Sequence, residues 1–111
     1  MKASTRDTDG VHIISLQGKI TIGAGDTQLR EVVSSALNSG VQKILLDLSG
    51  VTTIDSSGIG ELVGSYTTAT NRGAKLKLLH LPAKLNELLH ITQLITVFEV
   101  YDNERDAIAS F

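Results

Sequence analysis

The chain has no cysteine among its 111 residues, so disulfides, thiolate catalysis and cysteine-based metal sites are excluded. It also lacks a basic surplus, because 10 lysines and arginines stand against 12 acidic residues and leave a formal net charge of -2. General nucleic-acid binding is therefore disfavoured, since it needs cations that neutralise phosphates. No apolar run approaches the roughly 20 residues that cross a bilayer, and residues 1–7 hold no signal-peptide segment. We expect a soluble cytoplasmic protein.

What the chain does contain is ordinary for a globular protein, with 41% hydrophobic and 20% charged residues. Its length matches the common size of one domain, and no linker, repeat or low-complexity stretch divides it. A domain of this size buries roughly two-thirds of its unfolded surface, which suffices for a core without disulfides. We therefore expect residues 1–111 to form a single domain.

Turn signals and apolar runs predict the strands. Asp9-Gly10 predicts an N-terminal hairpin whose first strand is polar and lies at the sheet edge. A short run of aliphatic residues in the middle of the chain is typical of a buried central strand. The strands that we expect are Lys2–Thr8, Val11–Ile20, Ile44–Leu48, Leu76–Leu81 and Val97–Tyr101, with a further short segment, Val51–Ile54, after Ser49-Gly50.

Apolar residues at intervals of three and four predict three helices. Asp26 or Thr27 caps the first helix, and Gly40 suits a left-handed cap at its end. The boundaries that we expect for the other two helices are a start after Asp55–Gly58, an end at Arg72-Gly73, and Pro82 at the first position of the third helix.

Strands that alternate with helices imply a largely parallel sheet with right-handed crossovers. The predicted fold class is α/β, with a single-layer mixed, mostly parallel β-sheet, an N-terminal hairpin and crossover helices. Periodicity leaves open whether the helices cover one face of the sheet or both. Ala107, Ile108 and Phe111 indicate a short amphipathic tail.

The residues give little support for an enzyme, a metal site or a cofactor. Gly58, Gly60 and Gly64 do not have the G-x-G-x-x-G spacing of dinucleotide-binding loops, and we interpret the last two as positions where the helix packs closely on a neighbour. No histidine is placed to activate a serine. We expect no catalytic residue, no metal and no cofactor. The histidines, none in a metal-ligand spacing, are His12, His80 and His90.

The segment Asp55-Ser56-Ser57-Gly58 comes where an apolar strand region gives way to a helical pattern. Asp and Ser are preferred at the N-terminal cap of a helix. The first N–H groups of a helix lack intrahelical partners and attract negative charge, so a serine there can carry a phosphate. The residue types alone favour a helix cap.

The run Ile54-Asp55-Ser56-Ser57-Gly58-Ile59-Gly60 resembles the signature of the STAS-domain family, specifically its bacterial anti-sigma factor antagonists. The resemblance extends over nearly the whole chain. Gly18-Lys19-Ile20 resembles the family's glycine-led strand end, and Leu88–Leu94 with Val97-Phe98 resembles its closing helix, turn and strand. Thr21 departs from the family, which often has an acidic residue there, and the Thr21–Asp26 loop is about one residue longer than is typical.

The resemblance implies a partner-switching protein that is not itself an enzyme. In the unmodified form it would bind an anti-sigma factor that is also a serine kinase, and phosphorylation of Ser56 would release it. A serine phosphatase would reverse the modification. Ser57 would be a structural cap and the secondary candidate for phosphorylation, and Gly58 would leave room for the partner's phosphate donor. Asp55 would either orient the hydroxyl or cap the helix.

The resemblance also suggests a surface for the partner, formed by the loop after the second strand and the exposed side of the second helix. The residues that we expect there are Gly23, Gly25, Asp26 and Glu61. We expect a monomer or a weak dimer. Two alternatives remain: a STAS scaffold or regulatory subunit of a stress-signalling or transport complex, and an enzyme that uses Ser56 as a nucleophile.

Overall fold

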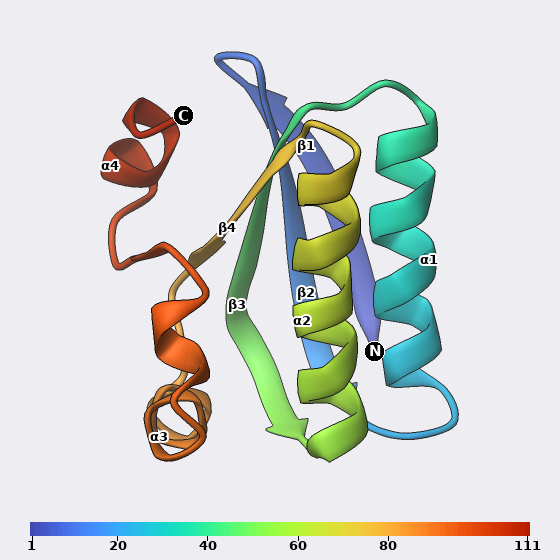
Figure 1. Ribbon diagram of the computed structural model, residues 1–111, viewed down its shortest axis with the longest axis vertical. Helices are drawn as coiled ribbons and strands as arrows, with labels where there is room; N and C mark the ends of the chain where they lie inside the picture. Colours follow the sequence, from blue (N-terminus) through green and yellow to red (C-terminus); the bar gives the residue numbers. More distant parts are fainter.

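The computed structural model describes residues 1–111 and contains one five-stranded sheet with helices on both of its faces (Figure 1). The strands lie in the order β1-β2-β3-β4-β5. The elements along the chain are β1 Lys2–Thr8, β2 Val11–Ile20, α1 Gly25–Asn38, β3 Lys43–Ile54, α2 Ser56–Asn71, β4 Lys75–Leu79, α3 Ala83–Ile91, the short 3-10 helix Leu94–Thr96, β5 Val100–Tyr101 and α4 Glu104–Ala109.

The sheet is mixed, as predicted. β1 pairs antiparallel with β2 and forms the polar edge, and β2, β3, β4 and β5 are parallel. The hairpin turn places Asp9 and Gly10 at φ +51° and +79°, which is the left-handed backbone that a two-residue hairpin turn requires. The fold class expected from the sequence is therefore confirmed.

The larger part of the core lies between the sheet and the helices α1, α2 and α3. It contains side chains from β2 and β3 together with Leu29 of α1, Leu62 of α2 and Leu85 of α3. Figure 1 shows α1 and α2 side by side on this face. Because only Asp55 separates β3 from α2, this helix begins at the end of the sheet where β3 ends.

A smaller apolar cluster on the opposite face lies under α4, where Ala107 packs on side chains of β2, β3 and β4. Lys77 of β4 is buried there, with only 3% of its surface exposed. Its Nζ donates to the carbonyl and the hydroxyl oxygen of Ser110 at 2.8 and 3.0 Å and lies 4.7 Å from the centre of the Phe111 ring. The C-terminal tail thus covers one end of this face.

Three strand predictions were wrong in extent. β4 ends at Leu79 instead of Leu81, because His80 takes a left-handed φ of +57°. β3 is one continuous strand from Lys43 to Ile54, because Gly50 lets it run close to β2: a Cβ there would lie 2.8 Å from the Leu16 carbonyl oxygen. β5 is only two residues long, since only Val100 and Tyr101 pair with the last two residues of β4, and residues 97–99 of the expected strand form a turn and an irregular segment after the 3-10 helix.

The helix ends differ in how well they were predicted. Gly40 follows α1 with a φ of +90°, so its predicted left-handed C-terminal cap is confirmed. Gly73 follows α2, which ends where it was predicted to end, and has the same left-handed backbone at φ +79°. Asp26 does not cap α1, because the helix already begins at Gly25 and its N-cap residue Ala24 has no capping side chain. Pro82 is the N-cap of α3 rather than its first residue.

The predicted close packing at Gly60 and Gly64 was wrong. A Cβ added to either glycine would meet no atom within 4 Å. The helix instead buries Leu62, Ser65 and Ala69. Gly64 lines a pocket of about 120 Å³ between α1 and α2, together with Arg30, Val33, Ser34, Glu61, Ser65 and Thr68.

Candidate functional site

The candidate site is formed where two parallel strands end next to each other. Ile20, the last residue of β2, is paired with Ile54, the last residue of β3. The segments that follow, the loop 21–24 and the start of α2, therefore leave the sheet at one edge. This arrangement brings the loop after β2 and the start of α2 to the same end of the molecule although the two segments are distant in sequence (Figure 1).

Asp55 caps α2 and also holds the neighbouring loop. Its backbone is extended, with φ -111° and ψ -174°, and its Oδ1 accepts a hydrogen bond from the Gly58 amide at 2.9 Å. Its Oδ2 accepts a second bond from the Ile22 amide at 3.0 Å. These bonds, first that from Ile22 and then that from Gly58, lower the pKa of Asp55 below its usual value. Of the two roles left open by the sequence, the structure shows the helix cap.

The two serines of the motif occupy the first two positions of α2. Ser56 is exposed and Ser57 is half-buried. The amide of Ile59 donates to the Asp55 carbonyl at 3.0 Å, so the first helical turn is formed directly behind both hydroxyls. Ser56 is therefore accessible from solvent while the helix is fully formed.

Gly58 is buried, and this changes the interpretation of its role. A Cβ at this position would lie 2.0 Å from the carbonyl oxygen of Ile20 and 2.7 Å from the Ile54 side chain. The absent side chain therefore lets α2 pack against the strand ends, whereas the sequence suggested clearance for a partner.

Gly25 has the same function at the start of α1. A Cβ added to Gly25 would lie 2.1 Å from the Lys19 carbonyl oxygen, and the residue is buried. Both helices thus begin in backbone contact with the end of β2. Of the loop residues, Ile22, Gly23 and Ala24 are exposed, whereas Gly25 presents no surface to a partner.

Ile22 is the residue that the sequence analysis missed. Its side chain is 74% exposed, the highest value of any large hydrophobic residue in the chain. It stands directly before Gly23, whose φ of +97° turns the loop back toward α1. The only signal in the sequence was an isolated aliphatic residue between Thr21 and a glycine, outside any periodic pattern.

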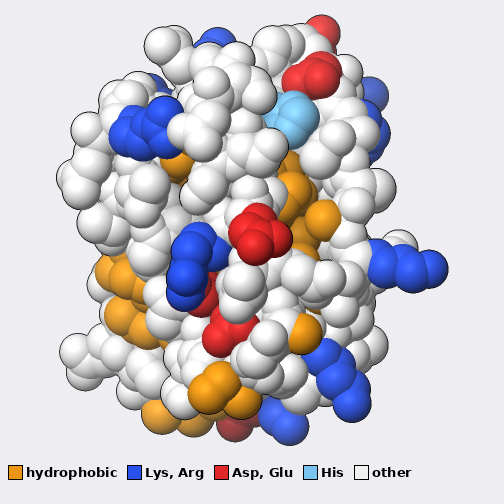
Figure 2. All heavy atoms as spheres, turned by 90° about the vertical axis from the view of Figure 1, so that its right-hand side faces the viewer, with side chains coloured by type: hydrophobic (Ala, Val, Ile, Leu, Met, Phe, Trp, Pro, Cys, Tyr) orange, Lys and Arg blue, Asp and Glu red, His pale blue; other side chains and the backbone are white.

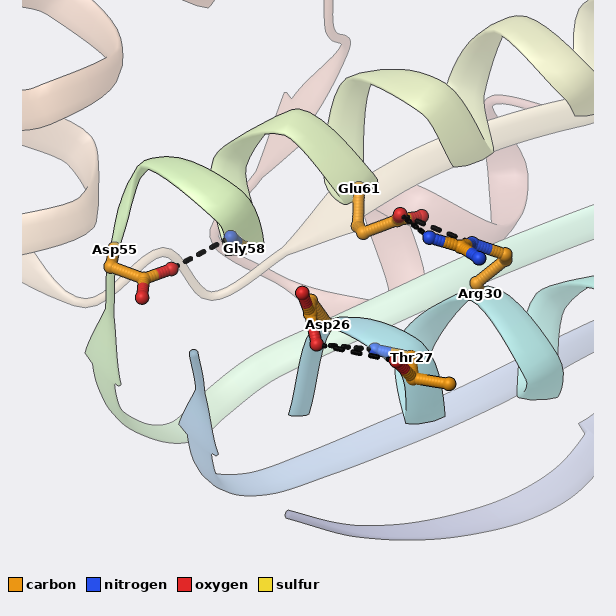
Figure 3. Close-up of polar contacts among 6 residues, drawn as sticks. All are labelled: Asp26, Thr27, Arg30, Asp55, Gly58 and Glu61. Atoms are coloured by element: carbon orange, nitrogen blue, oxygen red, sulfur yellow. Dashed lines mark hydrogen bonds and ion pairs between the residues drawn. The ribbon is translucent and has the colours of Figure 1, made fainter. Parts of the chain in front are cut away.

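Asp26 and Glu61 lie on the two helices beside the motif (Figure 3). Asp26 Oδ1 accepts from the Thr27 amide at 2.7 Å. Glu61 forms an ion pair with Arg30, whose Nε donates to its Oε1 at 3.1 Å, and this contact raises the pKa of Arg30. Arg30, which the sequence analysis did not include among the site residues, thereby links α1 to α2.

The surface near this end of the molecule mixes charged and apolar groups. Figure 2, which views the molecule from the side of α1, shows acidic and basic side chains interspersed over the helix and hydrophobic side chains at the lower end. Figure 1 places the loop 21–24 and the start of α2 at that end. The exposed side chain of Ile22 and the hydroxyl of Ser56 together form a surface suited to contact with another protein.

The structure holds no group of three or more His, Cys, Asp or Glu side chains that could bind a metal ion. His12 contacts Asp7 at 2.8 Å on the hairpin, His80 follows β4 and His90 lies near the end of α3. None of its helices is both long and apolar enough to reach across a bilayer.

A family model of the STAS domain matches residues 2–107. An anti-sigma F factor antagonist from Paenibacillus polymyxa is 25% identical over 99 residues, which cover 89% of this chain and 85% of that protein. A Thermotoga maritima protein provisionally named an anti-sigma factor antagonist is 28% identical over 99 residues, covering 89% and 88% of the two chains.

Solved structures agree. The crystal structure of an anti-sigma factor antagonist, also provisionally named, from Thermotoga maritima superposes with a TM-score of 0.88 at 26% identity, covering 97% of this chain and 92% of the other. The Bacillus protein SpoIIAA in its phosphorylated form has a TM-score of 0.74 over 98% of each chain, and at 20% identity this likeness shows the fold. The chain therefore belongs to the STAS-domain family, and relatives that match most of its length carry the name of anti-sigma factor antagonists.

Proposed function

We propose that this protein is an anti-sigma factor antagonist whose binding to its partner is switched by phosphorylation of Ser56. The observation that carries the proposal is the position of Ser56, an exposed hydroxyl at the first residue of α2 within the motif that begins at Asp55. The protein acts as a regulator rather than as a catalyst, in the cytoplasm.

The partner in this proposal is an anti-sigma factor that is also a serine kinase of the histidine-kinase-like ATPase class. The Oγ of Ser56 attacks the γ-phosphorus of ATP, the bond from that phosphorus to the β,γ-bridging oxygen breaks, and ADP leaves. The hydroxyl proton passes to a base of the kinase. A metal-dependent serine phosphatase restores the hydroxyl by hydrolysis and releases inorganic phosphate.

The switch follows from charge. A phosphate on Ser56 adds about 1.5 to 2 negative charges at neutral pH. The helix N-terminus favours an anion by only about 0.3 to 1 kcal/mol, and here Asp55 already accepts the Gly58 amide. A thousandfold loss of affinity corresponds to about 4 kcal/mol. Burying the dianion beside an ionised Asp55 at a protein interface opposes binding, and no rearrangement of the fold is needed.

The contact surface in this proposal consists of the exposed loop tip and the start of α2, namely Ile22, Gly23, Asp26, Ser56 and Glu61. Gly25 is left out of this set because it is buried. That a structural neighbour has been solved with a phosphate attached supports the view that this fold accommodates the modification.

The test is phosphorylation with the kinase-type anti-sigma factor from the same genome and ATP, followed by mass-spectrometric mapping of the phosphate. We expect one phosphate, on Ser56. S56A should abolish it and still bind the anti-sigma factor, while S57A, the matched control, should be labelled as the parent is. Full labelling of S56A would overturn the site, and failure of the parent to bind the anti-sigma factor would overturn the function.

A further inference from the structure

The carboxylate of Asp55 joins two segments that form the exposed end of the molecule. Oδ1 is bound by the Gly58 amide, within the first turn of α2, at 2.9 Å. Oδ2 is bound by the Ile22 amide, from the loop after β2, at 3.0 Å. The first bond joins residues three apart in the chain, whereas the second joins the start of α2 to the loop after β2. Both carboxylate oxygens of Asp55 therefore accept a hydrogen bond.

The loop that Asp55 holds has few other restraints. Two backbone bonds close its base, from the Asp26 amide to the Thr21 carbonyl at 3.1 Å and from the Gln28 amide to the Ala24 carbonyl at 2.9 Å. A Cβ at Gly23 would meet no atom within 4 Å, so the tip is not packed against the body of the protein. The bond from Ile22 to Asp55 is thus what ties the tip of the loop to α2.

The residue held in this way carries the most exposed large hydrophobic side chain of the protein, 74% exposed at Ile22. Exposed aliphatic groups gain free energy when a partner covers them, by roughly 25 cal/mol per Å² of apolar surface removed from water. A fixed anchor also binds more tightly than a mobile one, because less conformational freedom is lost on association. Fixing the position of Ile22 therefore raises the affinity for a partner that covers its side chain.

We propose that Asp55 is a positioning residue for partner binding: its carboxylate fixes the Ile22 side chain, as an apolar anchor, beside Ser56. This inference rests on the proposed function, since the partner that covers Ile22 is the anti-sigma factor. Asp55 acts on binding of the partner through the loop that its carboxylate holds. The Ile22 side chain and the Ser56 hydroxyl are thereby held at a fixed distance from each other. One surface of the anti-sigma factor can then contact both.

The variant that separates the two bonds is Asp55→Asn. Asparagine caps helices about as well as aspartate, so α2 keeps its start. It offers one acceptor oxygen and one NH₂ group, so only one of the two amides keeps a partner. Gly58 lies in the same helical turn as residue 55 and keeps the bond, and Ile22 loses it. We expect the Ile22 amide to exchange hydrogen about tenfold faster or more by NMR, since exchange reports local opening.

Binding of the anti-sigma factor is then measured by calorimetry for the parent, D55N, I22A and the double variant. D55N and I22A should each weaken binding about tenfold. Because Asp55 acts through Ile22, the double variant should lose little more than I22A alone, whereas independent contacts would add their losses. Asp47→Asn is the matched control, because Asp47 also accepts a backbone amide, that of Ser49 at 3.0 Å, but away from this site. It should bind as the parent does.

Two outcomes of the binding measurements would overturn the inference while leaving the proposed function intact: D55N that binds as tightly as the parent, or losses for D55N and I22A that add in the double variant. Absence of binding by the parent itself would instead remove the proposed function and the inference together. Unchanged exchange of the Ile22 amide in D55N would show that the bond does not hold the loop, and would overturn the inference without any partner.

Discussion

The Oδ2 atom of Asp55 accepts a hydrogen bond from the amide of Ile22 across a separation of 33 residues in the chain. A helix cap needs only one oxygen, and here the second one binds the loop after the neighbouring strand. The exposed tip of that loop and the first residues of α2 therefore form one surface. The mechanism proposed for this protein depends on that surface and on the packing of α2 that supports it.

Replacing Gly58 with alanine should destabilise the protein strongly. The new Cβ would lie 2.0 Å from the Ile20 carbonyl oxygen, which belongs to the backbone of a central strand and cannot move aside cheaply. We expect a loss of about 1–3 kcal/mol or more in the free energy of unfolding, measured by urea denaturation. Gly60→Ala is the matched control in the same helix, where a Cβ meets open space. It should gain about 0.5–1 kcal/mol, and equal effects of the two substitutions would contradict the packing role.

Ser56→Asp should weaken binding to the anti-sigma factor without affecting the fold. An exposed residue at the first position of a helix tolerates an acidic side chain, so the free energy of unfolding should stay within about 0.5 kcal/mol of the parent. Calorimetry and thermal unfolding measure the two quantities. Ser35→Asp, which adds the same charge on the exposed side of α1, is the control and should bind normally. Loss of stability in S56D comparable to its loss of binding would argue against a charge switch.

The stability conferred by Asp55 should disappear in acid. Hydrogen bonds from Ile22 and Gly58 lower the pKa of the folded-state carboxyl below the unfolded-state value. Its contribution is thus complete above the unfolded-state pKa of about 3.9 and is lost as the pH falls through the folded-state pKa. Denaturation of the parent and D55N from about pH 7 to pH 3 should show their difference in stability narrowing below about pH 4. A difference that stays constant over this range would contradict the assignment.

Lys77 should stabilise the C-terminal tail through its long side chain as well as its charge. Its ammonium group donates to Ser110 and faces the Phe111 ring, and the residue is almost fully buried. Lys77→Ala removes both the stem and the charge and should cost about 2–4 kcal/mol in the free energy of unfolding. Lys77→Met keeps the stem and should cost clearly less. Urea denaturation gives both values, and an equal cost would mean that packing of the stem contributes nothing.

Much of the fold was predictable because its signals are local. The Asp9-Gly10 turn and the left-handed glycine Gly40 depend only on the conformations that a few neighbouring residues can adopt. The same holds for the cap at Asp55, which serves an amide three residues away. The exposure of Ser56 at a helix start agrees with the position that the motif implied.

The remainder depends on contacts between distant segments, which no local pattern contains. The role of Gly58 follows from where β2 ends, and Lys77 is buried because the last residues of the chain fold over it. Gly50 keeps β3 continuous through close approach to β2, although a serine and a glycine there resembled a break. Ile22 had no periodicity to identify it, since it lies at an exposed loop tip outside any helix or strand.

The two buried glycines at the helix starts have a consequence for how such proteins diversify. Gly25 and Gly58 allow α1 and α2 to pack directly on the backbone of β2, so neither position accepts a larger residue without a shift of a helix. At the tip of the loop, by contrast, the Ile22 side chain is 74% exposed, so its replacement leaves the core untouched, whereas Gly23 is needed for its left-handed φ of +97°. Under the proposed mechanism, duplicated copies of such a gene would acquire separate partners by changing exposed side chains such as that of Ile22, and parallel signalling circuits in one cell would stay insulated from each other.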